Sequence, residues 1–267
     1  MTAIAVTIAG SDSGGGAGIQ ADLKTFSALG VYGASVITAL TAQNTRGVQG
    51  IYNIPPDFVK QQIDSVFSDL DVNAVKIGML SQPDIIQAVA NGLGKYNQAQ
   101  IILDPVMVAA SGDRLIAEEA VTTLKESLLP LALLITPNLP EAAVILGDNH
   151  PASNEQEVIS QAERLLKLGP KAVLIKGGHG NGPESTDILL DHNGVYRLSS
   201  ARLNSHNTHG TGCTLSSAIT AFIAKGADLR EAITEAKRYL TAALKAADSL
   251  HIGHGIGPVH HFHKLWK

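Results

Sequence analysis

The sequence has almost no cysteine and no long apolar run. Its one cysteine, Cys213, excludes a disulfide within the chain. No stretch of 18 or more consecutive apolar residues is present, so we expect no membrane-spanning helix and no membrane partner. The start of the sequence lacks a basic segment followed by a cleavage pattern. This absence disfavours secretion, and we expect a cytoplasmic protein.

The sequence also lacks a strong charge of either sign. Its 20 Lys and Arg residues against 24 Asp and Glu residues give a formal net charge of -4, so no basic field is available to attract nucleic acid. A chain of 267 residues can bury about 75% of its unfolded surface without disulfides or metals. Because no linker, repeat or low-complexity segment interrupts it, we expect one domain over residues 1–267.

Apolar runs of strand length alternate with stretches of helical spacing along most of the chain. Strands are predicted at 3–9, 34–42, 74–77, 101–103, 131–135 and 172–175, and helices at 19–29, 55–70, 83–93, 118–129, 141–146, 155–168 and 228–249. A hairpin is predicted at 185–198 around Asn193-Gly194. The pattern predicts an α/β fold: a mostly parallel central sheet with helices on both faces and a small antiparallel edge.

Polar residues follow the predicted strand ends. Because ligands of an open parallel sheet bind outside the carboxyl ends of its strands, these residues are expected along one edge. They would supply a lysine for nucleotide phosphates, acidic and amide groups for Mg²⁺, and a backbone anion site, which are the parts of a phosphoryl-transfer site. The residues are the glycine-rich loop 10–18, Gln43, Gly78, Met79, Asp104, Asn138, Glu141, Lys176 and the segment 207–213.

The segment 207–213 carries the strongest single motif. Gly210, Thr211 and Gly212 precede a run of helical spacing, so several backbone N–H groups would point at one anion beside the positive end of a helix. At such a position the thiol of Cys213 is predicted to ionise more readily than a free cysteine. A glycine-rich turn with a small, inert, buried cysteine is the alternative interpretation.

Two other patterns indicate different chemistry. Residues 16–21 match the G-x-G-x-x-A pattern of dinucleotide-binding loops, but no acidic residue follows the second strand to bind a ribose, which disfavours a dehydrogenase. Five histidines at 251–263 suggest a metal, yet their spacing fits no helical pair and glycines make the segment a loop. An ordered tail near the site is the better interpretation. The G-x-x-x-x-G-K-[ST] pattern is absent, so ATP would need a site of another construction.

Several motifs in combination resemble one family. They lie at 9–22, 41–45, 76–80, 104–107, 136–141, 176–179, 208–213 and 253–261. The chain is similar from end to end to the hydroxymethylpyrimidine/phosphomethylpyrimidine kinases of thiamin biosynthesis, in the ribokinase-like superfamily. The resemblance implies ATP- and Mg²⁺-dependent phosphorylation of 4-amino-5-hydroxymethyl-2-methylpyrimidine to its monophosphate and then to its diphosphate. A pyridoxal kinase is the nearest alternative, and a non-catalytic pyrimidine- or nucleotide-sensing module is another. A homodimer is expected by analogy.

The resemblance also implies roles for individual residues. The pyrimidine would lie against Gln43, whose amide can both accept from the amino group and donate to a ring nitrogen, and against Gly10, Asp22, Met79 and Val106. ATP would contact Lys176, Asn138 and Thr208, and Mg²⁺ would be organised by Asp104 and Glu141. Cys213 would be the base, with the N–H groups of Gly210, Thr211 and Gly212 on the transferring phosphoryl group.

Each of these roles has a plainer alternative. For Cys213 the alternative is the inert buried cysteine described above. Sugar kinases of the superfamily carry Asp as the base at this position, and the pyrimidine kinases share the departure seen in this chain. Asp22 is equally compatible with a solvated acid in the first turn of a helix, and Met79 with a core residue. Lys176 and Glu141 are compatible with a structural salt bridge, and Gln43 with an ordinary loop amide. The loops 14–18 and 109–114 are candidates to close over a substrate.

Overall fold

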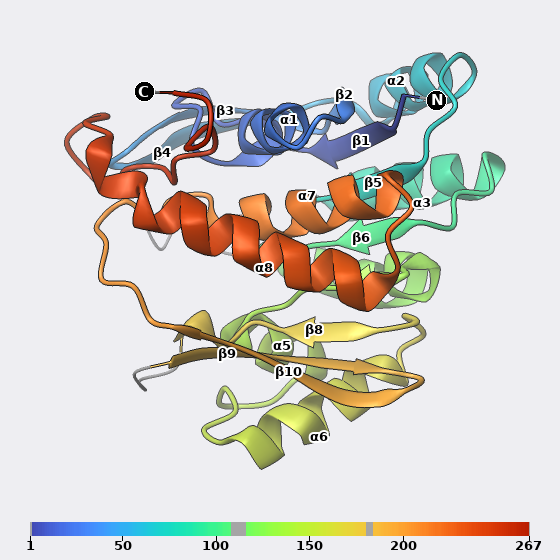
Figure 1. Cartoon of the computed structure of the whole chain (residues 1–267). Coiled ribbons are helices and arrows are strands. Elements are labelled where there is room, and N and C mark those ends of the chain that lie inside the picture. Colours follow the sequence, from blue (N-terminus) through green and yellow to red (C-terminus); the bar gives the residue numbers. More distant parts are fainter. Residues whose placement is uncertain (1, 108–115, 180–183, 267) are drawn as a thin grey trace.

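An eight-stranded sheet forms the centre of the protein (Figure 1). The structure is a computed structural model that describes residues 2–107, 116–179 and 184–266. The strand order is β10-β9-β8-β7-β6-β5-β1-β2. Neighbours from β2 to β8 are parallel, whereas β9 and β10 are antiparallel, which confirms the predicted sheet. The strands are β1 (Ile4–Ala9), β2 (Tyr32–Ile37), β5 (Ala74–Ile77), β6 (Ile101–Leu103), β7 (Leu134–Ile135), β8 (Val173–Ile175), β9 (Glu184–Asp191) and β10 (Gly194–Ala201).

Helices cover both faces of this sheet, as the unbroken apolar character of the central strands predicts. Side chains alternate between the faces along each strand: Ile101 and Leu103 belong to one core, and Ile102 belongs to the other. The first core is closed by α2 (Pro56–Phe67), α3 (Pro83–Lys95), α4 (Glu118–Thr123), α5 (Leu139–Leu146) and α6 (Glu155–Leu166). The second is closed by α1 (Gly18–Ala28), α7 (Thr211–Ala224) and α8 (Leu229–Lys245).

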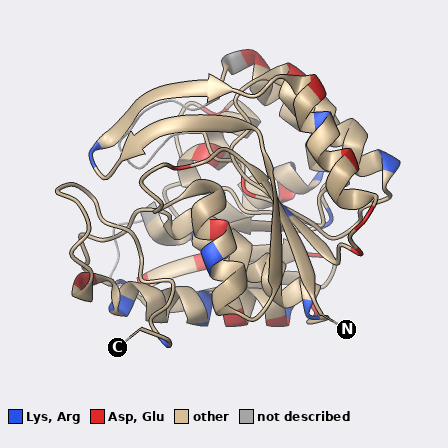
Figure 2. Cartoon of the chain, turned by 90° about the horizontal axis from the view of Figure 1, so that it is seen from above, with Lys and Arg blue, Asp and Glu red and all other residues tan. Residues whose placement is uncertain are grey.

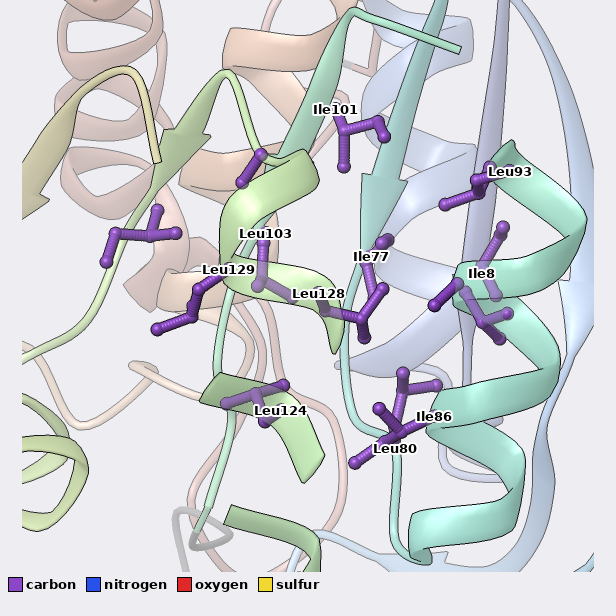
Figure 3. Packing of buried hydrophobic residues seen from close by; sticks show 14 of the residues in the cluster. Ile8, Ile77, Leu80, Ile86, Leu93, Ile101, Leu103, Leu124, Leu128 and Leu129 are labelled. Atoms are coloured by element: carbon purple, nitrogen blue, oxygen red, sulfur yellow. The ribbon is translucent and has the colours of Figure 1, made fainter. Parts of the chain in front are cut away.

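The first core is tightly filled with branched aliphatic side chains (Figure 3). Ile77 and Leu103 on the strands, Ile86 of α3 and Leu128 all belong to this core, and all four are fully buried. Truncating such a residue to alanine typically costs about 2 to 5 kcal/mol, because the removed atoms leave a cavity. This packing fixes the positions of the strand ends, from which the polar loops depart.

The predicted strand at 34–42 is wrong as a single element. It breaks at Thr38, and the chain leaves the main sheet to form β3 (Ala39–Asn44), which pairs antiparallel with β4 (Gly47–Asn53) in a separate two-stranded sheet. The sequence analysis missed β4. Most of this strand is exposed, and its glycines and amides give no apolar alternation.

Three other predicted boundaries need correction. The helix predicted at 118–129 is regular only to Thr123. A π-helix (Leu124–Leu128) and a 3₁₀ turn (Leu129–Leu131) follow, and this turn contains Pro130, which cannot donate a helical hydrogen bond. The strand predicted at 131–135 is reduced to β7, and the last long helix ends at Lys245. The other predicted elements are confirmed to within a few residues. The segment 109–114 lies outside the described residues.

Charged residues of both signs are interspersed along the outer helices (Figure 2). No helix in the described part of the chain combines the length and the apolar composition needed to cross a bilayer.

Candidate active site

A cavity of about 730 Å³ opens at the carboxyl ends of the parallel strands. Its volume lies within the usual range for small-molecule sites. Every residue for which the resemblance implies a role, except Asp22, lines it: Gly10, Gln43, Met79, Asp104, Val106, Asn138, Glu141, Lys176, Thr208, Gly210, Thr211, Gly212 and Cys213. The sequence argument that strand ends converge therefore predicted this edge correctly.

Lys176 lies between two buried carboxylates. Its ammonium group is 2.8 Å from Asp104 Oδ1 and 3.8 Å from Glu141 Oε2. Thr136 and Ser216 also donate hydrogen bonds to Asp104, at 3.1 and 3.3 Å. Although burial disfavours the charged carboxylate, the neighbouring ammonium groups of Lys176 and Lys76 lower the pKa of Asp104. The cation and this anion are therefore both charged at neutral pH.

Glu141 is held by the start of α5. Its Oε2 accepts the Asn138 N–H at 2.7 Å, while Asn138 Oδ1 accepts the Glu141 N–H at 2.8 Å, which makes a reciprocal capping box. Burial raises the pKa of Glu141 to about 7, against the opposing effect of Lys176, and the nearby Asp104 raises it further. Glu141 therefore titrates near neutral pH.

The segment 207–213, here called the anion loop, leads into α7 as predicted. Gly210 has a left-handed φ of 77°, and a Cβ there would overlap the carbonyl oxygen of Gly16. The N–H groups of Gly212 and Cys213 have no hydrogen-bond acceptor among the described residues. A Cβ built on Gly212 would lie 3.3 Å from Lys176 Nζ, so the loop borders the lysine.

The prediction for Thr211 needs correction. Its N–H turns back to the carbonyl of Thr208 at 3.3 Å, and its hydroxyl donates to the same oxygen at 2.5 Å. The free donors at the start of α7 are therefore those of the next two residues, Gly212 and Cys213.

Cys213 lies at the start of α7, but the prediction that its thiol ionises easily is wrong. Burial raises the pKa of its thiol to about 11. Lys76 and the Gly18 N–H favour the thiolate, whereas Asp22 and Asp104 oppose it. The sequence analysis considered the helix terminus but not the burial of the thiol, which is the largest cause of the raised pKa.

Gly10, Met79 and Gln43 also line the cavity. A Cβ at Gly10 would lie 2.5 Å from Met79 Cε, so glycine leaves the room that this methionine fills. Gln43 follows a β-bulge in β3, which redirects its side chain. Its N–H donates to Ser13 Oγ at 2.8 Å, and the same hydroxyl donates to the Gln43 carbonyl at 2.9 Å.

Asp22 lies beneath the cavity rather than in it. It is fully buried, and its oxygens accept hydrogen bonds from Lys76 at 2.8 Å, Thr7 at 2.6 Å and Ser217 at 2.5 Å. The predicted contact with a substrate hydroxymethyl is therefore not supported by its position. The predicted alternative, a solvated acid, is also wrong. The sequence around Asp22 did not indicate that this carboxylate pairs with the buried Lys76 on β5.

The sequence analysis missed several lining residues. Asp12 and His209 form a buried pair across the site, with Nε2 and Oδ2 2.9 Å apart. Asp12 is the only acidic residue in the glycine-rich loop, which was a usable signal. The cavity is also lined by Ser185 and Asp187 of β9, by Arg202, which follows β10, and by Lys237 of α8. The hairpin was predicted, but no motif indicated that it faces a ligand.

The C-terminal segment packs beside the anion loop, which confirms the predicted ordered tail. The His209 N–H donates to the Gly257 carbonyl at 2.9 Å, and the Val259 N–H donates to the His209 carbonyl at 3.3 Å. The Ile256 N–H donates to the carbonyl of Thr45 at 2.9 Å. The tail therefore connects the β3–β4 turn with the start of α7.

The fold and the site together define a small-molecule kinase of the ribokinase-like class. A family model described as phosphomethylpyrimidine kinase matches residues 12–260, and the chain belongs to this family. The hydroxymethylpyrimidine/phosphomethylpyrimidine kinase of Rhizobium meliloti is 59% identical over all of both chains.

Solved structures include relatives with two different names. The phosphomethylpyrimidine kinase of Clostridium difficile is 48% identical, with a TM-score of 0.80 over 90% of this chain and 98% of that one. An ADP complex of Bacillus subtilis pyridoxal kinase is 37% identical, with a TM-score of 0.90 over 98% of both chains. The overall fold therefore does not distinguish a phosphomethylpyrimidine kinase from a pyridoxal kinase.

Proposed function

We propose that this chain phosphorylates 4-amino-5-hydroxymethyl-2-methylpyrimidine with ATP, giving the monophosphate, and then phosphorylates the monophosphate to the diphosphate. The observation that carries the proposal is the arrangement of one continuous cavity. Lys176, Asp104 and the anion loop line the same cavity as Gln43 and Met79. We further propose a single kinase domain over residues 1–267, acting in the cytoplasm as a homodimer.

The nucleotide phosphates are proposed to lie between Lys176 and the start of α7. The Lys176 ammonium group is fixed by Asp104 at 2.8 Å, so its orientation is set before a ligand enters. The free N–H groups of Gly212 and Cys213 point from the positive end of a helix, where an anion is stabilised. Asn138 and Thr208 line the same part of the cavity.

The acidic residues fit an indirect role toward Mg²⁺. No group of three or more His, Cys, Asp or Glu side chains suited to a metal occurs in the described part of the chain. The oxygens of Asp104 already accept hydrogen bonds from Lys176, Thr136 and Ser216. Asp104 and Glu141 would therefore contact the water shell of an ion held mainly by the nucleotide, since Mg²⁺ gives up water reluctantly. When bound, the ion would offset phosphate charge.

Cys213 is proposed to accept the proton of the substrate hydroxyl as that oxygen attacks the γ-phosphorus. Burial raises the pKa of the thiol to about 11, and only the thiolate can accept a proton. The thiol proton must therefore pass to water before Cys213 takes the proton of the substrate hydroxyl. The ammonium group of Lys76 favours the thiolate that forms. The N–H groups at the start of α7 then stabilise the charge of the transferring phosphoryl group.

A coupled assay of ADP release tests the proposal. The aminopyrimidine and its monophosphate are supplied as separate acceptors with ATP and Mg²⁺, and pyridoxal is supplied as a third. We expect turnover with both pyrimidines. A strong preference for pyridoxal would favour the alternative suggested by the Bacillus subtilis relative, and no ADP release with any acceptor would favour a sensing module.

A further inference from the structure

Asp12 is a saturated acceptor at the wall of the cavity. Its side chain is 2% exposed, and its two oxygens accept the N–H groups of Gly14, Gly16 and Ala17 at 2.8 to 3.0 Å. Oδ2 also lies 2.9 Å from His209 Nε2. A carboxylate holding several N–H donors stays ionised and can only accept hydrogen bonds. The proton between the two side chains must therefore reside on His209 Nε2.

Because Nε2 carries this proton, His209 can donate a hydrogen bond to Gln43 from this atom but cannot accept one. The Gln43 Nε2 atom lies 3.4 Å from His209 Nε2. Two N–H donors then face each other, which is not a hydrogen bond. The main acceptor of the imidazole N–H is Asp12 at 2.9 Å. An amide oxygen at the position of Gln43 Nε2 would be a second, weaker acceptor of the same N–H, whereas an amide N–H there is repelled by it.

Thr41 contacts the other polar atom of the Gln43 amide and also favours one orientation of it. Its Oγ1 lies 2.9 Å from the Ser11 carbonyl oxygen and 3.2 Å from Gln43 Oε1. A hydroxyl has one proton, and the shorter contact to Ser11 uses it. The lone pairs of Thr41 then face Gln43 and require an N–H group there.

Both neighbours are satisfied if the amide of Gln43 is turned by 180°. Its oxygen then faces His209 and its nitrogen faces Thr41. Because amide oxygen and nitrogen have nearly the same shape, hydrogen-bond partners decide between the two orientations. The backbone of Gln43, fixed twice to Ser13, holds the group in place during this choice.

We propose that Asp12 and His209 are positioning residues that fix the amide of Gln43 in one orientation and so select the acceptor substrate. This proposal rests on the proposed function. One N–H and one oxygen lone pair of Gln43 remain for the cavity, in one fixed order. An aminopyrimidine offers an adjacent amino donor and ring-nitrogen acceptor that match them. The corresponding edge of pyridoxal carries an aldehyde and a hydroxyl. Pyridoxal therefore forms weaker hydrogen bonds with a Gln43 amide held in this orientation.

Two substitutions of His209 separate this role from a structural one. His209→Phe keeps a ring but removes the N–H, whereas His209→Gln keeps an N–H donor at a similar reach. For His209→Phe we expect kcat/KM with the aminopyrimidine to fall roughly 10- to 100-fold, mainly through KM. With pyridoxal we expect a smaller loss than with the aminopyrimidine, and His209→Gln should recover most of the loss with the aminopyrimidine.

Thr41→Val is a second test outside the anion loop, and it decides the matter if His209→Phe does not fold. It removes the other partner of the amide and should give the same selective loss. Equal losses with both acceptors, or a His209→Gln variant as impaired as His209→Phe, would overturn the proposal. Wild-type protein that releases no ADP with the aminopyrimidine would contradict the proposed function instead. In that case calorimetric binding of the aminopyrimidine to wild type and variants still tests the positioning role.

Discussion

The ammonium group of Lys76 lies 2.8 Å from the carboxylate of Asp22, and neither side chain is exposed to solvent. Burial disfavours the charge on Lys76, but Asp22, Cys213 and Asp104 together raise its pKa above the usual value. Removing one partner of a buried pair leaves an uncompensated charge. We therefore expect Lys76→Met to lower the free energy of unfolding by about 3 to 5 kcal/mol, measured by chemical denaturation.

The matched variant replaces both members of this pair. Lys76→Met combined with Asp22→Leu should be more stable than Lys76→Met alone, because no lone buried charge remains. If the double variant is as unstable as the sum of the single ones, the two side chains are not coupled.

The role of Cys213 is tested by removing its thiol. Cys213→Ala should lower kcat by roughly 10² to 10⁴, the usual contribution of a general base, while the melting temperature stays near that of wild type. Because the pKa of the thiol is about 11, wild-type kcat/KM should rise with pH above neutrality, and the rise should be absent in Cys213→Ala. Retained turnover in a folded variant would exclude the base role.

The stability of the protein should depend on the protonation of Glu141. Its pKa is raised from about 4.5 to about 7 in the folded state, so the folded protein binds this proton more tightly than the unfolded chain. The stabilisation is complete below about pH 4.5 and is lost as the pH rises through 7. The free energy of unfolding should fall by about 3 kcal/mol over this window. Glu141→Gln, measured in parallel, should remove this component of the pH dependence.

Two glycine substitutions should have opposite effects on stability. Gly210→Ala places a Cβ against the Gly16 carbonyl at a positive φ, and we expect it to lower the melting temperature, with a loss of more than about 1 kcal/mol. Gly94, within α3, has open space around a Cβ, so Gly94→Ala should be neutral or stabilise by up to about 1 kcal/mol. A similar loss in both variants would contradict the close approach at Gly210.

Local sequence patterns predicted most helices and strands and the edge of the sheet on which the site lies, because both depend on residues that are close together in the sequence. Apolar runs marked β1, β5 and β8, and residues that follow a parallel strand must emerge on the same edge. The pairing of Asp22 with Lys76, and of Asp12 with His209, depends on segments that are far apart in the chain. Burial of Cys213 is also set by tertiary packing, which is why its ionisation was mispredicted from the helix terminus alone.

The C-terminal segment described above has a consequence for synthesis. The sheet from β2 to β8 is complete by Ile175, but the loop at His209 is held by the carbonyl of Gly257 and the N–H of Val259. Since domains emerge from the ribosome N-terminus first, we expect nascent chains to gain a protease-resistant sheet before they can hold the anion loop in place. Ribosome-stalled chains ending before residue 253 should therefore resist proteolysis yet fail to bind nucleotide.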